Sequence, residues 1–324
     1  MVEFVGSETG IEKTLVPREG YTLHALPLAG LAGNPLARGR AALLTLRATI
    51  RCTRIIQRMK PRAVLGVGGY ASAPAVLAAR TLGVPTFLHE QNSVPGRVNR
   101  LASRFTKETL VTFPDARQRL KGAAWVGMPT RTEIFGASRD EALRNLGLEP
   151  PVVLIFGGSG GALRINLAAA EAFGKSTPYT VVQVAGRRDF PRLSTRNAKH
   201  KILEYVDDLW RYLAAADVVV SRAGAGSLFD IAAAGRAAIL IPFPYSTGDH
   251  QLQNARYFTE KGAAELMFDS EVGVTSLRYR VDELLSDDRR REELARRMGA
   301  LATPNAAGEV AWRLLGATQK ERGS

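Results

Sequence analysis

The sequence predicts an α/β fold made of two Rossmann-like, doubly wound domains. Short apolar runs that end in glycine or polar residues recur along the chain, and stretches with helical periodicity separate them. Continuous Val/Ile/Leu runs are typical of parallel strands buried on both faces, and their alternation with helices indicates βαβ crossovers. A length of 324 residues, with 45% apolar and 23% charged residues, fits two globular domains of ordinary size.

The expected elements follow this alternation from the N-terminus onward. The expected strands lie within 63–70, 85–92, 152–161, 179–186, 216–226 and 237–243. The expected helices lie within 38–60, 73–82, 161–173, 226–234 and 250–262. Segment 127–151 interrupts the alternation with Pro, Gly and charged residues, a composition typical of connections between domains. We therefore expect an N-terminal domain over 1–130 and a C-terminal domain over 131–324.

Cysteine usage and hydropathy exclude several classes of protein. Cys52 is the single cysteine, so the chain has no intramolecular disulfide, which fits a reducing cytoplasm. The N-terminus has no basic segment followed by an apolar one, so we expect no secretory signal. No run of 18 apolar residues is present, which predicts that the chain does not span a membrane but leaves it free to lie on one.

The first motif with chemical content is the glycine-rich turn 156–162, placed between a strand and a helix. Glycines let the backbone approach a ligand, and the free N–H groups of a helix N-terminus favour an anion such as phosphate. Ser159 adds a hydroxyl donor. Leu163 and Arg164 follow where a P-loop has its lysine, which disfavours a P-loop nucleotide triphosphatase. Taken alone, the pattern also fits a turn without a ligand.

The second motif, 221–230, is again a strand, a glycine turn and the start of a helix. Asp230 lies one turn into that helix, where its carboxylate can accept hydrogen bonds from the diol of a sugar or ribose. The alternative is that Asp230 only compensates the positive end of the helix dipole.

The third motif, 246–255, follows the expected strand 237–243 and holds seven hydrogen-bonding side chains. Open α/β sheets bind ligands at the carboxyl edge of their strands, which is where this segment is expected. A loop that is merely solvated more often contains Lys and Glu than this set of Asp, His, Gln and Asn.

These motifs, with four further segments, resemble the nucleotide-sugar glycosyltransferases of the GT-B fold, and among them the N-acetylglucosaminyltransferases of peptidoglycan synthesis. The similar segments keep the order and spacing of that family over nearly the whole chain. They are LGVGGYASAP (65–74), LHEQNSVPGRVNR (88–100), VGMPTR (126–131), FGGSGGALRIN (156–166), YVDDL (205–209), SRAGAGSLFDIAAAG (221–235) and IPFPYSTGDHQLQNA (241–255).

The resemblance implies an inverting, metal-independent transfer that uses no cofactor. N-acetylglucosamine would pass from UDP-N-acetylglucosamine to the C4 hydroxyl of undecaprenyl-pyrophosphoryl-MurNAc-pentapeptide. The enzyme would be a peripheral protein on the cytoplasmic face of the bacterial cell membrane. The last helix, expected within 307–316, would cross back to the first domain.

The resemblance also implies which residues of the second domain bind the donor. The glycine turn with its serine would hold the diphosphate, the segment 225–230 the nucleoside and ribose, and the segment 249–254 the sugar. Asp230 stands where the family typically has Glu, and Gly226 replaces a larger apolar residue. The candidate donor-binding residues are Arg131, Gly158, Ser159, Gly160, Gly161, Ala225, Asp230, Asp249, Gln251 and Asn254.

The first domain is expected to receive the acceptor. In the family the chain opens with a strand, a glycine-rich loop with a candidate catalytic histidine, and a helix, whereas this chain starts at the equivalent of the second strand. We expect that unit to be encoded upstream of Met1 rather than lost. Glu90 is then the candidate catalytic base, with an orienting role as the alternative, and Tyr70 and Asn92 are candidate acceptor contacts.

The basic charge is concentrated in one part of the first domain. Lys and Arg number 44 against 31 Asp and Glu, a net charge of +13. Segment 20–89 contains nine of these cations and no acid, and four of them, Arg47, Arg51, Arg54 and Arg58, share one helix face. Such a helix with apolar neighbours suits an anionic membrane surface. The alternatives are a core-packed helix with a solvated basic face, and nucleic-acid binding, which the lack of interleaved aromatic residues disfavours.

Two classes of function remain open from the sequence alone. One is the glycosyltransferase. The other is a protein that binds the UDP-sugar without turnover, because its first glycine loop is missing. A GT-B transferase with another lipid acceptor is a related alternative.

Overall fold

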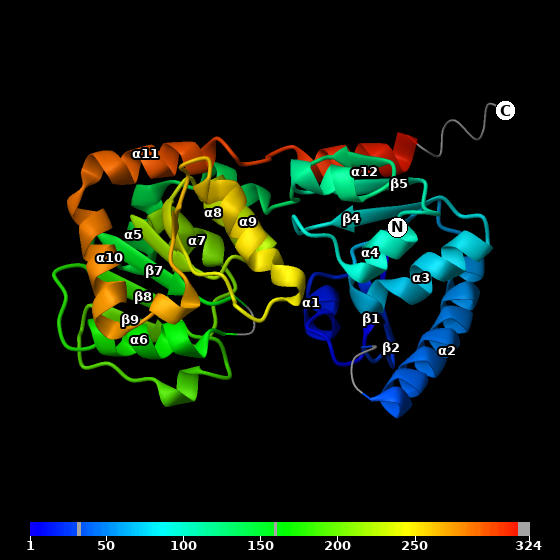
Figure 1. Ribbon diagram of the computed structural model, residues 1–324, viewed down its shortest axis with the longest axis horizontal. Coiled ribbons are helices and arrows are strands. Elements are labelled where there is room, and N and C mark those ends of the chain that lie inside the picture. The colour runs from blue at the N-terminus through cyan, green and yellow to red at the C-terminus, as the bar shows by residue number, and fades with distance from the viewer. Residues whose placement is uncertain (31–33, 159–160, 317–324) are drawn as a thin grey trace. The chain divides into compact units, whose positions relative to one another are not determined.

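The computed structural model describes residues 1–30, 34–158 and 161–316, which form two compact α/β units (Figure 1). Unit 1 comprises Met1–Gly127 together with the chain from Gly308, and unit 2 comprises Met128–Ala307. Every strand pair in both units is parallel. The predicted fold class, two Rossmann-like α/β domains, is therefore confirmed.

Unit 2 contains a six-stranded sheet in the order β12-β11-β10-β7-β8-β9. Read from β9, the strands follow the doubly wound order 3-2-1-4-5-6, which reverses between β7 and β10. The strands are β7 (Val152–Phe156), β8 (Thr180–Val184), β9 (His200–Leu203), β10 (Val218–Ser221), β11 (Ala237–Leu240) and β12 (Glu265–Leu266).

Every residue of the central strands β7, β10 and β11 is buried. Since side chains of a strand alternate between its two faces, both faces of this sheet are covered by helices. The first helices after the central strands begin directly at the two glycine turns. The helices of unit 2 are α5 (Arg139–Leu146), α6 (Leu163–Phe173), α7 (Leu209–Ala215), α8 (Ala225–Ala234), α9 (His250–Thr259), α10 (Val274–Ser286) and α11 (Asp288–Gly299). Short 3₁₀ turns are η2 (Thr132–Gly136), η3 (Phe190–Arg192), η4 (Thr247–Asp249) and η5 (Asp269–Glu271).

The core of unit 2 explains why these apolar runs are strands. All five residues of β7 are buried, and side chains of a strand alternate between its faces. Val153 and Ile155 pack with apolar side chains of α6 and α10, including Phe173 and Leu277. Leu154 on the opposite face is also fully buried. The uninterrupted apolar run is therefore needed to cover both faces.

Unit 1 holds a four-stranded sheet in the order β3-β4-β5-β6 and a separate pair, β1 with β2. The strands are β1 (Glu3–Ser7), β2 (Thr22–Leu26), β3 (Val64–Gly66), β4 (Thr86–Glu90), β5 (Glu108–Val111) and β6 (Ala123–Trp125). The helices are α1 (Glu12–Arg18), α2 (Pro35–Met59), α3 (Gly69–Thr81), α4 (Arg97–Ala102) and α12 (Ala306–Gly316), and η1 (Pro114–Arg119) is a 3₁₀ turn.

The expected strand 63–70 is shorter than predicted. It ends at Gly66, because Gly68 and Gly69 adopt left-handed backbone angles, φ +86° and +70°, and start α3. Residues with a side chain rarely adopt these angles, so the double glycine turns the chain here.

α2 is a 25-residue helix that begins at an asparagine cap. The side chain of Asn34 accepts a hydrogen bond from Ala37 N at 2.9 Å, and Pro35 stands at the first helical position. A narrow stripe of small or apolar residues, Ala48, Cys52 and Ile56, packs on Ala78 and Ala79 of α3. Because this stripe is narrow, much of the helix surface stays exposed. Within the described residues, no helix is long and apolar enough to span a membrane.

The end of the described chain packs on unit 1. Val310 of α12 lies in a cluster with Leu110 of β5 and Val126. Arg313 of the same helix forms an ion pair with Glu108, with an N–O distance of 2.5 Å. These contacts attach α12 to β5.

Candidate functional site

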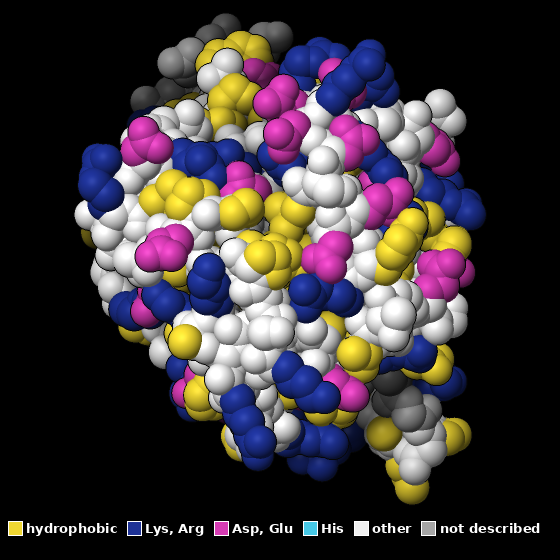
Figure 2. All heavy atoms as spheres, turned by 90° about the vertical axis from the view of Figure 1, so that its left-hand side faces the viewer, with side chains coloured by type: hydrophobic (Ala, Val, Ile, Leu, Met, Phe, Trp, Pro, Cys, Tyr) yellow, Lys and Arg dark blue, Asp and Glu magenta, His cyan; other side chains and the backbone are white. Residues whose placement is uncertain are grey.

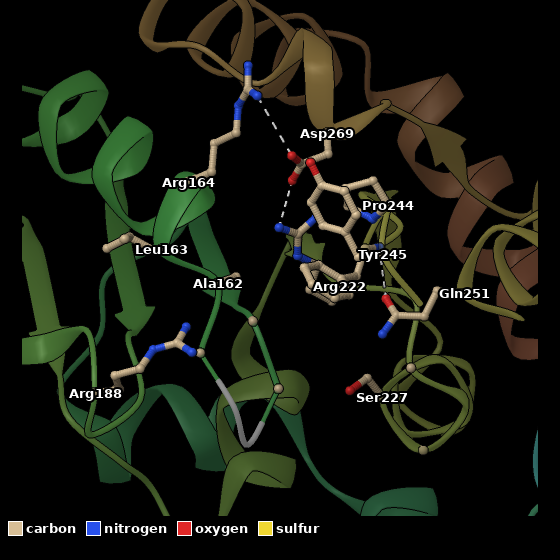
Figure 3. A pocket seen from close by; sticks show the side chains of 16 residues that line it. Ala162, Leu163, Arg164, Arg188, Arg222, Ser227, Pro244, Tyr245, Gln251 and Asp269 are labelled. Atoms are coloured by element: carbon tan, nitrogen blue, oxygen red, sulfur yellow. Dashed lines mark hydrogen bonds and ion pairs between the residues drawn. The ribbon is translucent and has the colours of Figure 1, made fainter. Parts of the chain in front are cut away.

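A cavity of about 640 Å³ lies in unit 2 at the carboxyl ends of β7 and β10 (Figure 3). The strand order reverses between these two strands, and ligands of open α/β sheets bind at such a point. The cavity is lined by Gly157, Gly158, Gly161, Ala162, Leu163, Arg164, Arg188, Arg222, Gly224, Gly226, Ser227, Phe243, Pro244, Tyr245, Gln251 and Asp269.

The first wall is the glycine turn that leads into α6. Gly158 and Gly161 have φ of +82° and +73°, and a Cβ on Gly157 would lie 2.4 Å from the Cβ of Ala162. The turn therefore requires glycine at these positions. Helix α6 starts directly after it, and the unpaired N–H groups of a helix start attract an anion. Ser159 and Gly160, both predicted to contact the diphosphate, lie outside the described residues.

The second wall carries a buried arginine. The Arg222 side chain is 8% exposed, its Nη2 lies 2.6 Å from Oδ1 of Asp269, and its Nη1 donates to the carbonyl oxygens of Ile241 and Pro242. Arg222, at the end of β10, thus connects to the segments that follow β11 and β12. It holds in place the loop that forms this wall.

The charges that line the cavity leave it positive. Arg164 donates to the carbonyl oxygens of Ser270 and Val272, and its Nη1 lies 3.8 Å from Asp269. Three arginines and one aspartate among the lining residues give a formal charge of +2. An anionic group with several oxygens, such as a diphosphate, matches this charge and these donors.

Two aromatic side chains stand beside the buried arginine. Tyr245 is 84% exposed, and its ring lies edge-on to that of Phe243 with the centroids 5.7 Å apart. The side-chain oxygen of Gln251 accepts a hydrogen bond from Phe243 N at 3.0 Å. The cavity thus offers aromatic faces as well as cations, a combination that suits a ligand with both rings and charge.

The predicted residues 225 and 230 lie on α8 beside the cavity. Ala225 stands between two of the lining glycines. Burial raises the pKa of Asp230 to about 6, and the positive charge of Arg131 acts in the opposite direction. Arg131 and Asp230, both predicted to bind the donor, therefore interact with each other.

The predicted segment 249–254 is divided between the cavity and the core. Gln251 lines the cavity. Asp249 is exposed at the start of α9, with φ of +54°. Asn254, predicted to hold the sugar, is fully buried and donates to the carbonyl oxygen of Ala223 at 3.2 Å. Asn254 therefore stabilises the turn before α8, and it is not among the residues that line the cavity.

Glu90 of unit 1 is buried at the end of β4, where it is 2% exposed. Its carboxylate accepts hydrogen bonds from Asn92 N at 3.0 Å, Gly96 N at 3.0 Å and Asn99 Nδ2 at 2.8 Å. A catalytic base needs a free lone pair within reach of the hydroxyl that it deprotonates. Of the two roles left open from the sequence, this geometry supports the orienting one.

The neighbours of Glu90 differ in exposure. His89 is buried with Nε2 3.1 Å from the carbonyl oxygen of Gly127, and burial lowers its pKa. Tyr70 is 42% exposed on the first turn of α3, and Asn92 is partly buried. Tyr70 is therefore the more accessible of the two predicted acceptor contacts.

The four charged residues that line the cavity, Arg164, Arg188, Arg222 and Asp269, were not among the candidates from the sequence. Arg222 stands inside the second motif and Arg164 directly follows the first, so position alone could have indicated both. Arg188 and Asp269 lie in segments without a recognisable pattern. Only the parallel order of the strands brings them to the cavity.

Comparisons with known proteins agree with this geometry. Residues 1–111 match the glycosyltransferase family 28 N-terminal domain, and residues 152–310 match the C-terminal domain of the same family. A relative from Rubrobacter xylanophilus, named UDP-N-acetylglucosamine–N-acetylmuramyl-(pentapeptide) pyrophosphoryl-undecaprenol N-acetylglucosamine transferase, is 64% identical over 99% of this chain and 97% of its own. A relative of the same name from Myxococcus xanthus is 38% identical, covering 96% of this chain and 83% of its own.

The similarity extends to the three-dimensional structures of known proteins. The crystal structure of Acinetobacter baumannii MurG superposes with a TM-score of 0.75 at 28% identity, over 98% of this chain and 91% of that one. The calicheamicin glycosyltransferase CalG4 shares the fold, with a TM-score of 0.65 at 17% identity over 95% and 89%. The chain therefore belongs to glycosyltransferase family 28, within the family of UDP-N-acetylglucosamine–N-acetylmuramyl-(pentapeptide) pyrophosphoryl-undecaprenol N-acetylglucosamine transferases.

Proposed function

We propose that this chain transfers N-acetylglucosamine from UDP-N-acetylglucosamine to the C4 hydroxyl of undecaprenyl-pyrophosphoryl-MurNAc-pentapeptide. The observation that carries the proposal is the positively charged cavity at the β7/β10 reversal, in a chain 64% identical to a relative named for this reaction. The acceptor hydroxyl attacks C1 of the donor sugar and releases its proton, the bond from C1 to the diphosphate oxygen breaks, and UDP leaves with the electron pair.

The proposed donor site uses unit 2 alone. The diphosphate lies against the glycine turn and the start of α6, where cations stabilise the charge that develops on the leaving group. The carboxylate of Asp230 accepts hydrogen bonds from the ribose hydroxyls, and Arg131 beside it helps to hold the nucleotide. Gln251 and Asp249 contact the sugar. The supporting facts are the lining of the cavity and the electrostatic coupling of Arg131 to Asp230.

The acceptor contacts belong to unit 1 in this proposal. Tyr70 and Asn92 bind the muramoyl part of the acceptor, and Glu90 fixes the loop that carries Asn92. The support is the exposure of Tyr70 and the hydrogen bond from Asn92 N to the Glu90 carboxylate.

We further propose that α2 places the protein on an anionic membrane surface, which fits a lipid-linked acceptor. Leu43, Leu46 and Ile50 are 49%, 59% and 49% exposed, and recur every three or four residues on the helix. Arg47 and Arg51 are exposed on the same turns. Exposed apolar side chains next to arginines are typical of helices that lie in a membrane interface.

The test is a transfer assay with the full chain, radiolabelled UDP-N-acetylglucosamine and a short-chain form of the lipid acceptor. The proposal expects a labelled disaccharide lipid together with equimolar UDP. Binding of the UDP-sugar without any transfer would instead support the alternative of a binding protein. Transfer to a different lipid-linked sugar, and none to this one, would support another GT-B acceptor.

A further inference from the structure

Arg188 is a cation of the cavity that comes from outside the three sequence motifs. It lies in the turn after β8, its side chain is 70% exposed, and it lines the cavity. Figure 3 shows its guanidinium pointing toward the chain that leads into Ala162. Its Nε donates to Oδ1 of Asp189 at 2.9 Å. Among the described residues, its two terminal amino groups have no hydrogen-bond partner.

A chain of buried polar side chains stands behind this arginine. Asp189 is 1% exposed, and its Oδ2 accepts a hydrogen bond from Asn166 Nδ2 at 3.0 Å. Asn166 Oδ1 in turn accepts from Gln183 Nε2 at 3.1 Å, and Gln183 Oε1 lies 3.0 Å from His200 Nε2. Asn166 and Gln183 have no exposed surface. A buried hydrogen-bonded network of this kind holds its members in one arrangement.

The same turn is packed tightly against the glycine turn before α6. A Cβ on Gly161 would lie 2.7 Å from Oδ2 of Asp189, and a Cβ on Gly186 would lie 3.1 Å from the Cα of Gly161. Two glycines thus let the backbones of the two turns touch. The position of Arg188 relative to the glycine turn is therefore set by backbone packing and not only by a long, mobile side chain.

We propose that Arg188 binds the diphosphate of the nucleotide donor, and that Asp189 and Asn166 are positioning residues that hold its guanidinium toward the glycine turn. The proposal rests on the donor chemistry proposed above for this cavity. A guanidinium bound through Nε keeps amino groups for phosphate oxygens, and its planar shape favours two such bonds at once. Arg164 and Arg222 are already bound to protein oxygens. Among the residues that the structure describes, Arg188 is the cavity arginine whose terminal amino groups have no protein partner.

The first test measures the affinity of the full chain for UDP and for uridine by calorimetry. Arg188→Gln is expected to weaken UDP binding by about 10- to 100-fold, the effect of losing a hydrogen bond between charged groups, and to leave uridine binding unchanged. Arg192→Gln is the matched control, because it removes an exposed arginine of η3 that does not line the cavity. Native UDP affinity in Arg188→Gln would overturn the proposal.

The second test separates positioning from general stability. Asp189→Asn is expected to weaken UDP binding in the native background and to have no further effect in the Arg188→Gln background, because it acts through the arginine. Equal losses in both backgrounds would show a role independent of Arg188. If the native chain binds uridine but gains nothing from the diphosphate, the proposed donor site itself fails, and that outcome is distinct from native-like UDP binding by Arg188→Gln.

Discussion

The two units present their arginines in different settings. In unit 2, three arginines surround a cavity at the ends of β7 and β10, and the acid Asp269 compensates part of their charge. In unit 1, the loop at the end of β4 is closed by its own hydrogen bonds to Glu90, and the cations lie instead on the open face of α2. A small anionic ligand suits the first setting and an extended anionic surface suits the second.

The helices of the two units show the same contrast. Arg296 and Arg297 of α11 both pair with Glu293, and the face of unit 2 shown in Figure 2 mixes Lys and Arg with Asp and Glu. Arg51 and Arg54 of α2 form no ion pair with a described residue, and segment 20–89 has no acid. A high content of arginine does not by itself indicate a binding surface. The arginines of α2, which have no acidic neighbour in their segment, fit the anionic surface proposed above.

The largest expected effect is on membrane binding. Replacing Arg47, Arg51, Arg54 and Arg58 by Gln should weaken binding to vesicles with anionic lipid by about 4 kcal/mol at low salt, at about 1 kcal/mol per arginine near such a surface. Vesicle sedimentation measures this. The control Arg289→Gln/Arg296→Gln/Arg297→Gln on α11 should have a much smaller effect. Equal losses in the two variants would remove the distinction between the helices.

The next largest effect concerns Glu90. Glu90→Ala leaves the buried Nδ2 of Asn99 and the partly buried backbone N–H groups of Asn92 and Gly96 without their acceptor. The free energy of unfolding should therefore fall by about 3 kcal/mol, because an unpaired buried donor costs about 1–3 kcal/mol and a partly buried one costs less. Denaturant titration measures this. Glu90→Gln keeps one acceptor oxygen and should lose less stability and keep measurable transfer. A fully stable Glu90→Gln variant without any turnover would instead favour the role of catalytic base.

A smaller effect is expected at the glycine turn of unit 2. Gly161→Ala places a side chain at φ +73° and 2.7 Å from the Asp189 carboxylate, which costs about 1–2 kcal/mol for the backbone alone. UDP affinity should fall at least tenfold, as calorimetry can measure. Gly136→Ala, where a Cβ meets open space at an ordinary φ, is the matched control. Unchanged UDP affinity in Gly161→Ala would separate this turn from the donor.

A pH-dependent effect on stability is expected at Asp230. Its pKa is about 6 in the folded chain against 3.8 for an ordinary aspartate, so the folded state binds the proton more tightly. The contribution of this group is present below pH 4 and is lost as the pH rises through 6. Asp230→Asn should therefore be more stable than the native chain at pH 7.5, by about 3 kcal/mol at about 1.4 kcal/mol per pKa unit, and about equally stable at pH 4. A difference that does not change with pH would contradict this assignment.

Local patterns predicted the features that depend on neighbouring residues in the chain. The turns before α6 and α8 follow from glycines placed between an apolar run and a helix, and the exposed arginines of α2 follow from their helical spacing. Asn254 was assigned to the ligand from its motif, but it shares the buried face of α9 with Ala255 and Phe258. Phe258 follows Asn254 by four residues and Ala255 by three, and residues at these spacings share one face of a helix. The spacing of Asn254 from the apolar Phe258 thus already indicates a core position.

Long-range pairs could not be predicted in this way. Asp269 meets Arg222 because β11 and β12 continue the sheet beyond β10, and no local pattern encodes that order. The saturation of Glu90 depends on Gly96 and Asn99 returning to the end of β4, which a sequence motif does not specify. The buried partners of Arg188 likewise come from separate elements.

Amide hydrogen exchange with and without UDP-N-acetylglucosamine tests the central claim, that the donor binds in unit 2 at the reversal of the strand order. With the full chain, exchange should slow in peptides that cover 152–166, 182–190 and 221–229. Peptides that cover the end of β4, 88–99, should stay unchanged in the absence of acceptor. Slowed exchange confined to unit 1 at saturating donor would contradict the account.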